Sequence, residues 1–102
     1  MSPNLKMPFE RVAILGVGLL GGSVALAAKK HGLAKNVVGS GRRQAPLQAA
    51  LSRGVLDEVA DVARACRDAD LVLLATPLAS MAAVLEAAVP ELGPKTIVTD
   101  VG

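Results

Sequence analysis

The sequence predicts an α/β domain built on a single sheet of parallel strands. Apolar runs typical of strands alternate along the chain with segments of helical spacing, and short connections join them. The run at residues 71–75 is apolar throughout, which is typical of a strand buried on both faces of a parallel sheet. Because crossovers between parallel strands are right-handed, we expect three layers and a doubly wound sheet of about five strands in the order 3-2-1-4-5.

The expected elements follow a polar, proline-containing lead-in at residues 1–10. Strands are expected at residues 11–15, 36–40, 55–59, 71–75 and 96–99, and the third of these is either a brief strand or an extended crossing. Helices are expected at residues 19–31, 44–53, 61–68 and 78–90. There are no repeats or low-complexity linkers, so residues 11–102 are expected to form one domain.

Capping residues and apolar spacing define the ends and the buried faces of the helices. Gly32 and Gly54 follow the first two helices and supply their C-terminal stops. His31 lies in a basic last turn, where positive charge suits the helix dipole, so we interpret it as a capping residue rather than a catalyst. The residues expected on buried helix faces are Leu20, Val24, Ala27 or Ala28, Leu47, Ala50, Leu51, Val62, Ala65, Cys66, Leu78, Met81, Leu85 and Ala88.

The composition describes a globular protein and argues against several classes of function. Hydrophobic residues make up 52% of the 102-residue chain and charged residues 20%, which is unlike a disordered segment. The formal net charge is +2, there is no block of like charges, and Phe9 is the one aromatic residue, so we expect no nucleic-acid partner. Cys66 and His31 are single, which excludes an internal disulfide and gives no basis for a metal site. The lone cysteine indicates a reducing compartment, and we expect a cytoplasmic protein.

An uncharged stretch at residues 12–28 also fits a secretory signal peptide. It follows Lys6 and Arg11 and contains Ala25-Leu26-Ala27, which is typical of a cleavage site. However, phased glycines have no purpose in such a segment, and the rest of the chain continues the strand–helix alternation. We therefore favour a folded domain without a membrane span.

The first strand runs directly into Gly16-Val17-Gly18-Leu19-Leu20-Gly21, where a helix begins. Strand, glycine turn and helix in that order form the dinucleotide-binding fingerprint of Rossmann-type domains. Gly16 permits the tight turn, Gly18 lets the backbone approach a pyrophosphate, and Gly21 lets helix and strand pack closely. The positive end of the helix and its free N–H groups then face the anion.

The carboxyl ends of the predicted strands indicate where a ligand binds, because ligands of such sheets lie at this edge, near the point where the strand order reverses. Besides the glycine turn, residues 40–43, 76–77 and 100–102 all follow predicted strand ends. The residues expected to bind a cofactor are Gly16, Val17, Gly18, Leu19, Leu20, Gly21, Ser40, Arg42, Arg43, Ala75, Thr76, Pro77, Asp100 and Gly102.

The residues after the second strand favour NADP over NAD as the cofactor. An NAD site places a carboxylate about twenty positions past the fingerprint, where it binds the ribose 2′-OH. That position is Gly41, and Arg42 and Arg43 follow it. Two guanidinium groups can instead pair with a 2′-phosphate, and no carboxylate stands there to repel it. In the alternative interpretation, both arginines are solvated residues ahead of the second helix.

Residues 14–23, 74–77 and 99–102 are more specific than a generic fingerprint. In this order and spacing they resemble the amino-terminal domain of the prephenate/arogenate dehydrogenase family, and the resemblance extends over residues 11–102. Gly22-Ser23 after the third glycine is its most telling part, and the Ser40-x-Arg42-Arg43 segment is similar to the NADP-preferring members.

The resemblance implies an oxidoreductase of tyrosine biosynthesis. Such an enzyme oxidises prephenate or arogenate with loss of carbon dioxide and passes a hydride from the hydroxyl-bearing ring carbon to the nicotinamide. By motif match, the glycine turn would hold the pyrophosphate and the two arginines the adenosine phosphate. Thr76-Pro77 would border the nicotinamide ribose, and residues 100–102 would begin a loop beside the nicotinamide.

The chain departs from the family pattern because it ends at Gly102. In the family, a serine, a catalytic histidine, a substrate-binding arginine and a helical domain that forms the homodimer come later. We therefore assign no catalytic residue to this chain and expect a truncated cofactor domain that binds NADP(H) but turns over no substrate.

Two other interpretations stay open at this point. One is the cofactor domain of a β-hydroxyacid dehydrogenase or a pyrroline-carboxylate reductase-like enzyme, which share a similar amino-terminal half. The other is a nucleotide-sensing module without chemistry, which a short chain would suit.

Overall fold

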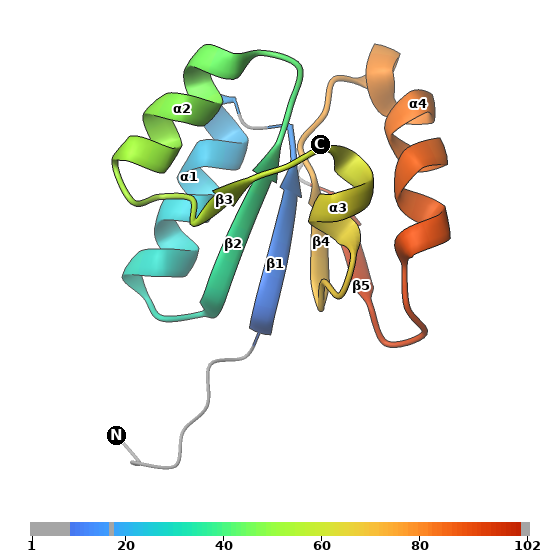
Figure 1. The fold of residues 1–102 in the computed structure, drawn as a ribbon, viewed down its shortest axis with the longest axis horizontal. Helices are drawn as coiled ribbons and strands as arrows, with labels where there is room; N and C mark the ends of the chain where they lie inside the picture. The colour runs from blue at the N-terminus through green and yellow to red at the C-terminus, as the bar shows by residue number, and fades with distance from the viewer. Residues whose placement is uncertain (1–8, 17, 101–102) are drawn as a thin grey trace.

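The computed structural model describes residues 9–16 and 18–100, which form one five-stranded sheet flanked by helices (Figure 1). The elements are β1 (Phe9–Leu15), α1 (Leu19–Lys30), β2 (Ala34–Ser40), α2 (Gln44–Ser52), β3 (Glu58–Val59), α3 (Val62–Cys66), β4 (Leu71–Leu74), α4 (Leu78–Ala88), a 3₁₀ turn η1 (Val89–Glu91) and β5 (Ile97–Asp100). Within the described part of the chain, no helix combines the length and the apolar character needed to cross a membrane.

The sheet has the predicted order, β3-β2-β1-β4-β5, and every neighbouring pair of strands is parallel. Leu15, the last residue of β1, pairs with Ser40 of β2 on one side and with Leu74 of β4 on the other. The carboxyl ends of these three strands therefore lie at one edge, toward which the arrowheads of β1 and β2 point in Figure 1.

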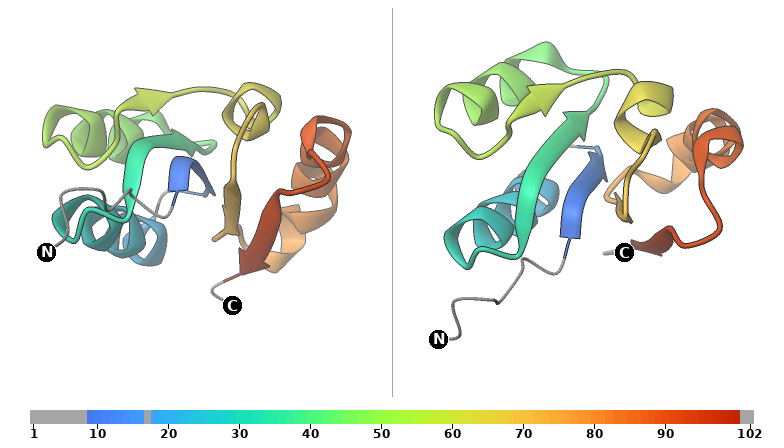
Figure 2. Two further views of the ribbon diagram at one scale, coloured as in Figure 1. Left: turned by 90° about the horizontal axis from the view of Figure 1, so that it is seen from below. Right: turned by 60° about the horizontal axis from the view of Figure 1, so that its bottom comes forward.

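Each face of the sheet carries its own hydrophobic core. Val12 and Ile14 of β1 pack toward α1 and α2, whereas Ala13 and Leu15 pack toward α3 and α4. Figure 2 shows the two pairs of helices on opposite sides of the sheet. This split follows from the alternation of side chains along a strand, and it explains why residues 12–15 of β1 and all four residues of β4 are apolar.

Three strands differ in length from the predictions by two residues or more, while β4 ends one residue early and β5 is shifted by one residue. β1 begins at Phe9 and β2 at Ala34, two residues earlier in each case, because Phe9 pairs with Ala34 across the sheet. The polar residues Glu10 and Lys35 hid this extension in the sequence pattern. β3 contains only Glu58 and Val59, because the preceding residues form the turn that leads out of α2.

The first two helices end as predicted. The His31 N–H caps α1 by donating to the Ala27 carbonyl, and Gly32 follows with a φ of +63°. Gly54 follows α2 with a φ of +75°. Glycine adopts such positive φ angles without the strain that a Cβ would bring.

The buried face of α4 was predicted with one error. Ala88 is buried and Met81 and Leu85 pack against the core, but the Leu78 side chain is 88% exposed. Leu78 is the first residue of α4, four residues past the end of β4, and lies at the exposed start of the helix. In α1, Ala28 rather than Ala27 is buried, and Val24 packs against the same core.

Candidate functional site

Gly16 forms the turn that leaves β1. Its φ is +97°, and a Cβ at this position would lie 2.7 Å from the carbonyl oxygen of Ala75. The Gly16 N–H donates to the Ser40 carbonyl at 2.6 Å, which ties the turn to the end of β2. Both the backbone conformation and the close approach of residue 75 therefore require glycine here.

Gly21 lets α1 approach the turn. A Cβ at this position would lie 2.5 Å from the Gly16 carbonyl oxygen and 3.3 Å from the side chain of Ile14. Gly21 therefore packs behind the turn, between helix and strand, rather than facing solvent.

Gly18 differs from the other two glycines because it faces open space. No atom lies within 4 Å of where its Cβ would be, although it is the N-cap residue of α1. The first turn of α1 has neither a side-chain cap nor an acidic residue. Its backbone N–H groups are thus available to an anion, and the open side of Gly18 gives a phosphate room to approach them.

A pocket of about 880 Å³ lies at the carboxyl edge of the strands. It is lined by Leu15, Gly16, Gly18, Ser40, Gly41, Arg42, Arg43, Asp61, Val62, Ala75, Thr76, Pro77, Ser80 and Val84. Its size and its glycine, hydroxyl and guanidinium lining fit a dinucleotide with its phosphates.

The pocket brings together most of the residues predicted to bind a cofactor. Those that line it are Gly16, Gly18, Ser40, Arg42, Arg43, Ala75, Thr76 and Pro77. Asp100 ends β5 beside Leu74 but is not among the lining residues. Val17 and Gly102 lie outside the described residues, as do the side chains of Leu19 and Leu20.

Six lining residues were not among those predicted: Leu15 and Gly41, which directly adjoin predicted residues, and Asp61, Val62, Ser80 and Val84. Asp61 follows the carboxyl end of β3, so the expectation that ligands bind at strand ends could have identified it. Its Oδ1 accepts a hydrogen bond from the Arg64 N–H at 2.8 Å and caps α3. Val62, Ser80 and Val84 come from α3 and α4. No motif marks them, because they line the pocket through the packing of whole helices.

The two arginines have different surroundings. Arg42 Nη1 donates to Ser80 Oγ at 3.3 Å, which joins the loop after β2 to the first turn of α4. Arg43 is exposed at the N-cap of α2. Ser40 below them is buried, and Thr76 Oγ1 on the other side of the pocket donates to the Leu15 carbonyl at 2.9 Å.

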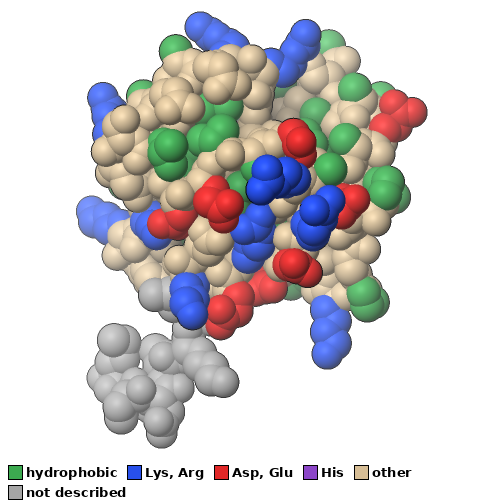
Figure 3. Space-filling model, in the orientation of Figure 1, with side chains coloured by type: hydrophobic (Ala, Val, Ile, Leu, Met, Phe, Trp, Pro, Cys, Tyr) green, Lys and Arg blue, Asp and Glu red, His purple; other side chains and the backbone are tan. Residues whose placement is uncertain are grey.

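Neither Arg42 nor Arg43 forms an ion pair within the described part of the chain, so their positive charges are not neutralised by a carboxylate. Arg11, Lys29, Lys35 and Arg67 each pair with a carboxylate, whereas Arg42 and Arg43 do not. Figure 3 shows Lys and Arg interspersed with Asp and Glu on the face in view. The pocket therefore has two cationic side chains available to an anionic ligand.

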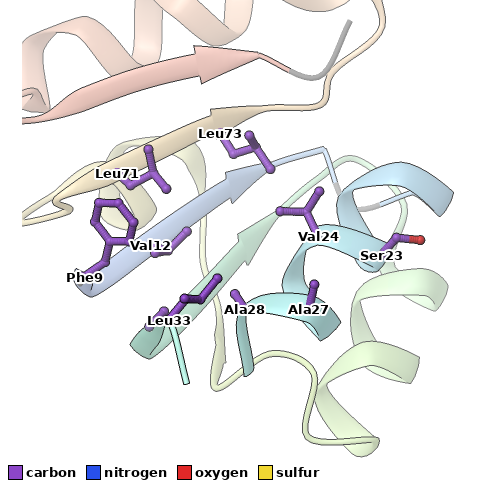
Figure 4. A pocket seen from close by; sticks show the side chains of 10 residues that line it. Phe9, Val12, Ser23, Val24, Ala27, Ala28, Leu33, Leu71 and Leu73 are labelled. Carbon is purple, nitrogen blue, oxygen red and sulfur yellow. The ribbon is translucent and has the colours of Figure 1, made fainter. Parts of the chain in front are cut away.

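A second pocket, of about 290 Å³, has a different character. It lies between α1 and the strands β1 and β4, where Val24 and Ala28 face Val12 and Leu73 (Figure 4). Its lining is apolar apart from Ser23, so it offers a phosphate no cationic side chain. Of the two pockets, the one at the carboxyl edge fits a phosphate-bearing ligand better.

The single cysteine and histidine have structural positions. Cys66 is fully buried in the α3–α4 core, and burial raises the pKa of its thiol, so it stays protonated and is no activated nucleophile. His31 caps α1. Within the described residues, no three His, Cys, Asp or Glu side chains gather as a metal site would require.

Comparisons with known proteins agree with this geometry. The sequence model of the family described as "Prephenate dehydrogenase, nucleotide-binding domain" matches residues 24–102 of this chain. Prephenate dehydrogenase of Bacillus subtilis (strain 168) is 35% identical over 95 residues, which cover 91% of this chain and 26% of that protein.

Two solved structures share both fold and sequence with the chain. Synechocystis arogenate dehydrogenase has a TM-score of 0.80 at 31% identity, covering 90% of this chain and 32% of its own. Prephenate dehydrogenase from A. aeolicus, solved with hydroxyphenyl propionate and NAD+, has a TM-score of 0.82 at 26% identity, covering 95% and 34%. The chain thus spans about a quarter to a third of these relatives. It belongs to the family of prephenate dehydrogenase nucleotide-binding domains.

Proposed function

We propose that the chain is the NADP(H)-binding domain of an enzyme that oxidatively decarboxylates prephenate or arogenate in tyrosine biosynthesis. The observation that carries the proposal is one pocket in which an open glycine turn lies with two uncompensated arginines. A dinucleotide phosphate needs both a close backbone approach and positive charge.

The pyrophosphate would bind at the start of α1. The N–H groups of the first turn and the positive end of the helix favour an anion there, and Gly18 leaves its place open. Gly16 and Gly21 allow this shape, because a Cβ at either position would collide with the carbonyl oxygen of Ala75 or of Gly16.

The adenosine 2′-phosphate would bind at Arg42 and Arg43. No carboxylate occupies residues 40–43, so nothing at the end of β2 would repel a second phosphate. Asp61 is the one acidic residue lining the pocket in the described part of the chain, and its Oδ1 is engaged by the Arg64 N–H. Since the A. aeolicus relative was solved with NAD+, the preference for NADP has to be measured.

Calorimetric titration of the 102-residue chain with NADPH and with NADH tests this proposal. We expect tighter binding of NADPH, and a loss of about tenfold to a hundredfold in its affinity when R42A and R43A remove charge-assisted hydrogen bonds. NADH affinity should stay nearly unchanged in both variants. R53A is the matched control, because Arg53 is exposed and does not line the pocket. Equal affinities of the wild type for both cofactors would refute the NADP preference.

In the complete enzyme, the bound nicotinamide would accept the hydride that the substrate loses. This chain would bind and orient the cofactor, and the catalytic and substrate-binding groups would come from the part of the enzyme outside it. We further propose a cytoplasmic homodimer that acts on a small molecule and has neither nucleic acid nor membrane as a partner. The single free Cys66 fits a reducing compartment, and the mixed surface charge argues against a nucleic-acid partner.

A further inference from the structure

The contact between Arg42 and Ser80 crosses the cofactor pocket. Arg42 lies in the loop after β2, Ser80 lies in α4, and both residues line the pocket. Nη1 of the guanidinium donates to Ser80 Oγ at 3.3 Å. A guanidinium carries five N–H donors, so this bond occupies one and leaves the others available.

Arg42 is bound by a neutral hydroxyl, whereas the basic residues that form ion pairs in the described chain are bound by carboxylates. Arg11, Lys29, Lys35 and Arg67 are held by carboxylates, which also neutralise them. Ser80 is neutral, so it can hold the Arg42 side chain in place without cancelling its charge. A carboxylate at the same place would compete directly with a cofactor phosphate.

Ser80 is itself held in place by the fold. Its N–H donates to the Pro77 carbonyl at 2.9 Å at the start of α4. The next residue, Met81, and then Val84 pack against the α3–α4 core. The hydroxyl is therefore presented from a packed helix rather than from a mobile loop, as a positioning group requires.

We propose that Ser80 is a positioning residue that holds the Arg42 guanidinium in the pocket and so sets the preference for a cofactor with a 2′-phosphate. This inference rests on the proposed NADP(H) function. A long arginine side chain loses rotamer freedom when it binds a phosphate, and a neutral hydrogen bond formed beforehand reduces that loss. Ser80 acts through Arg42 and needs no contact of its own with the cofactor.

Titration of S80A and S80T with NADPH and NADH tests the positioning role. S80A should weaken NADPH binding about threefold to tenfold, the range of one neutral hydrogen bond, and leave NADH affinity unchanged. S80T keeps a hydroxyl and should restore the wild-type ratio. In the R42A background, S80A should have no further effect, because the residue that it positions is gone.

Two variants that introduce a negative charge, S80D and A79D, give a second test of the NADPH to NADH affinity ratio. S80D should pair with Arg42 and repel a phosphate, lowering NADPH affinity by about tenfold or more while NADH binding is retained. A79D places the same charge in the same helical turn, but Ala79 is exposed and does not line the pocket. It should leave the ratio of NADPH to NADH affinity within about twofold of the wild type.

The outcomes separate this inference from the proposed function. If R42A weakens NADPH binding but S80A and S80D leave the ratio unchanged, the positioning role is wrong and the NADP(H) proposal stands. If R42A itself leaves the ratio unchanged, both are wrong. Equal weakening of NADPH and NADH by S80A would mean a purely structural role for Ser80 and would also overturn the inference.

Discussion

The three glycines of the turn have different roles, as the atoms around each of them show. Gly16 and Gly21 each leave no room for a Cβ, with backbone oxygens 2.7 Å and 2.5 Å from that point. Gly18 has no atom within 4 Å. Two glycines are therefore required by the fold, and the third is free to serve a ligand.

Alanine substitutions should separate these roles. G21A should destabilise the domain by about 1–3 kcal/mol, because a methyl group cannot fit against the Gly16 carbonyl. G18A should leave the melting temperature unchanged and weaken NADPH binding, because its methyl group would occupy the space that a phosphate needs. Thermal melting and calorimetric titration measure the two effects.

G22A is the control for this pair. Gly22 lies inside α1 with nothing within 4 Å of its Cβ position, so alanine should stabilise the helix by about 0.5–1 kcal/mol. Wild-type NADPH affinity in G18A, or a wild-type melting temperature in G21A, would contradict the assignment of roles.

At the scale of elements, parallel pairing explains why the lining residues at strand ends were predicted, whereas those on helices were not. The carboxyl ends of β1, β2 and β4 meet at one edge, so Gly16, Ser40 and Thr76 could be placed together from strand order alone. Helical residues such as Ser80 depend on where α4 packs, and Leu78 shows that periodicity alone misjudges the exposed start of a helix.

The short strand β3 is fastened to its neighbours by a polar cluster. Asn36 Nδ2 and Arg11 Nη1 donate to Glu58 Oε2 at 3.1 Å and 3.0 Å. The hydrogen bond from Asn36, followed by that from Arg11, lowers the pKa of Glu58 below its usual value of 4.5. The cluster thus joins β1, β2 and β3 through one carboxylate.

This cluster predicts a specific dependence of stability on pH. Because the folded pKa of Glu58 lies below the unfolded value, its carboxylate stabilises the fold above that value, and this contribution is lost as the pH falls through the folded pKa. Urea unfolding from about pH 6 to about pH 3 should show a smaller loss of stability in E58Q than in the wild type. E86Q changes an exposed α4 residue outside the described ion pairs and should follow the wild type. Identical slopes in E58Q and the wild type would contradict this role.

At the scale of the whole molecule, two pockets are candidate ligand sites, and the chemistry of their lining residues indicates which one fits a dinucleotide. The larger pocket at the carboxyl edge carries backbone N–H groups, hydroxyls and guanidinium groups, whereas the smaller one between α1 and the sheet is apolar apart from Ser23. The position of the larger pocket follows from the strand order, which the sequence predicted. The smaller pocket could not be predicted, because it depends on how closely α1 packs against β1 and β4.

A dinucleotide is expected to bind at the carboxyl edge of the sheet. Titration of the isotopically labelled 102-residue chain with NADPH, followed by amide NMR shifts, tests this expectation most directly. Saturable shifts should gather at Gly16, Gly18, Ser40, Arg42 and Thr76, and residues of the hydrocarbon pocket such as Ala28 and Leu33 should stay unmoved. Shifts centred on Ala28 and Leu33, or no saturable shift at the glycine turn, would contradict cofactor binding at this edge.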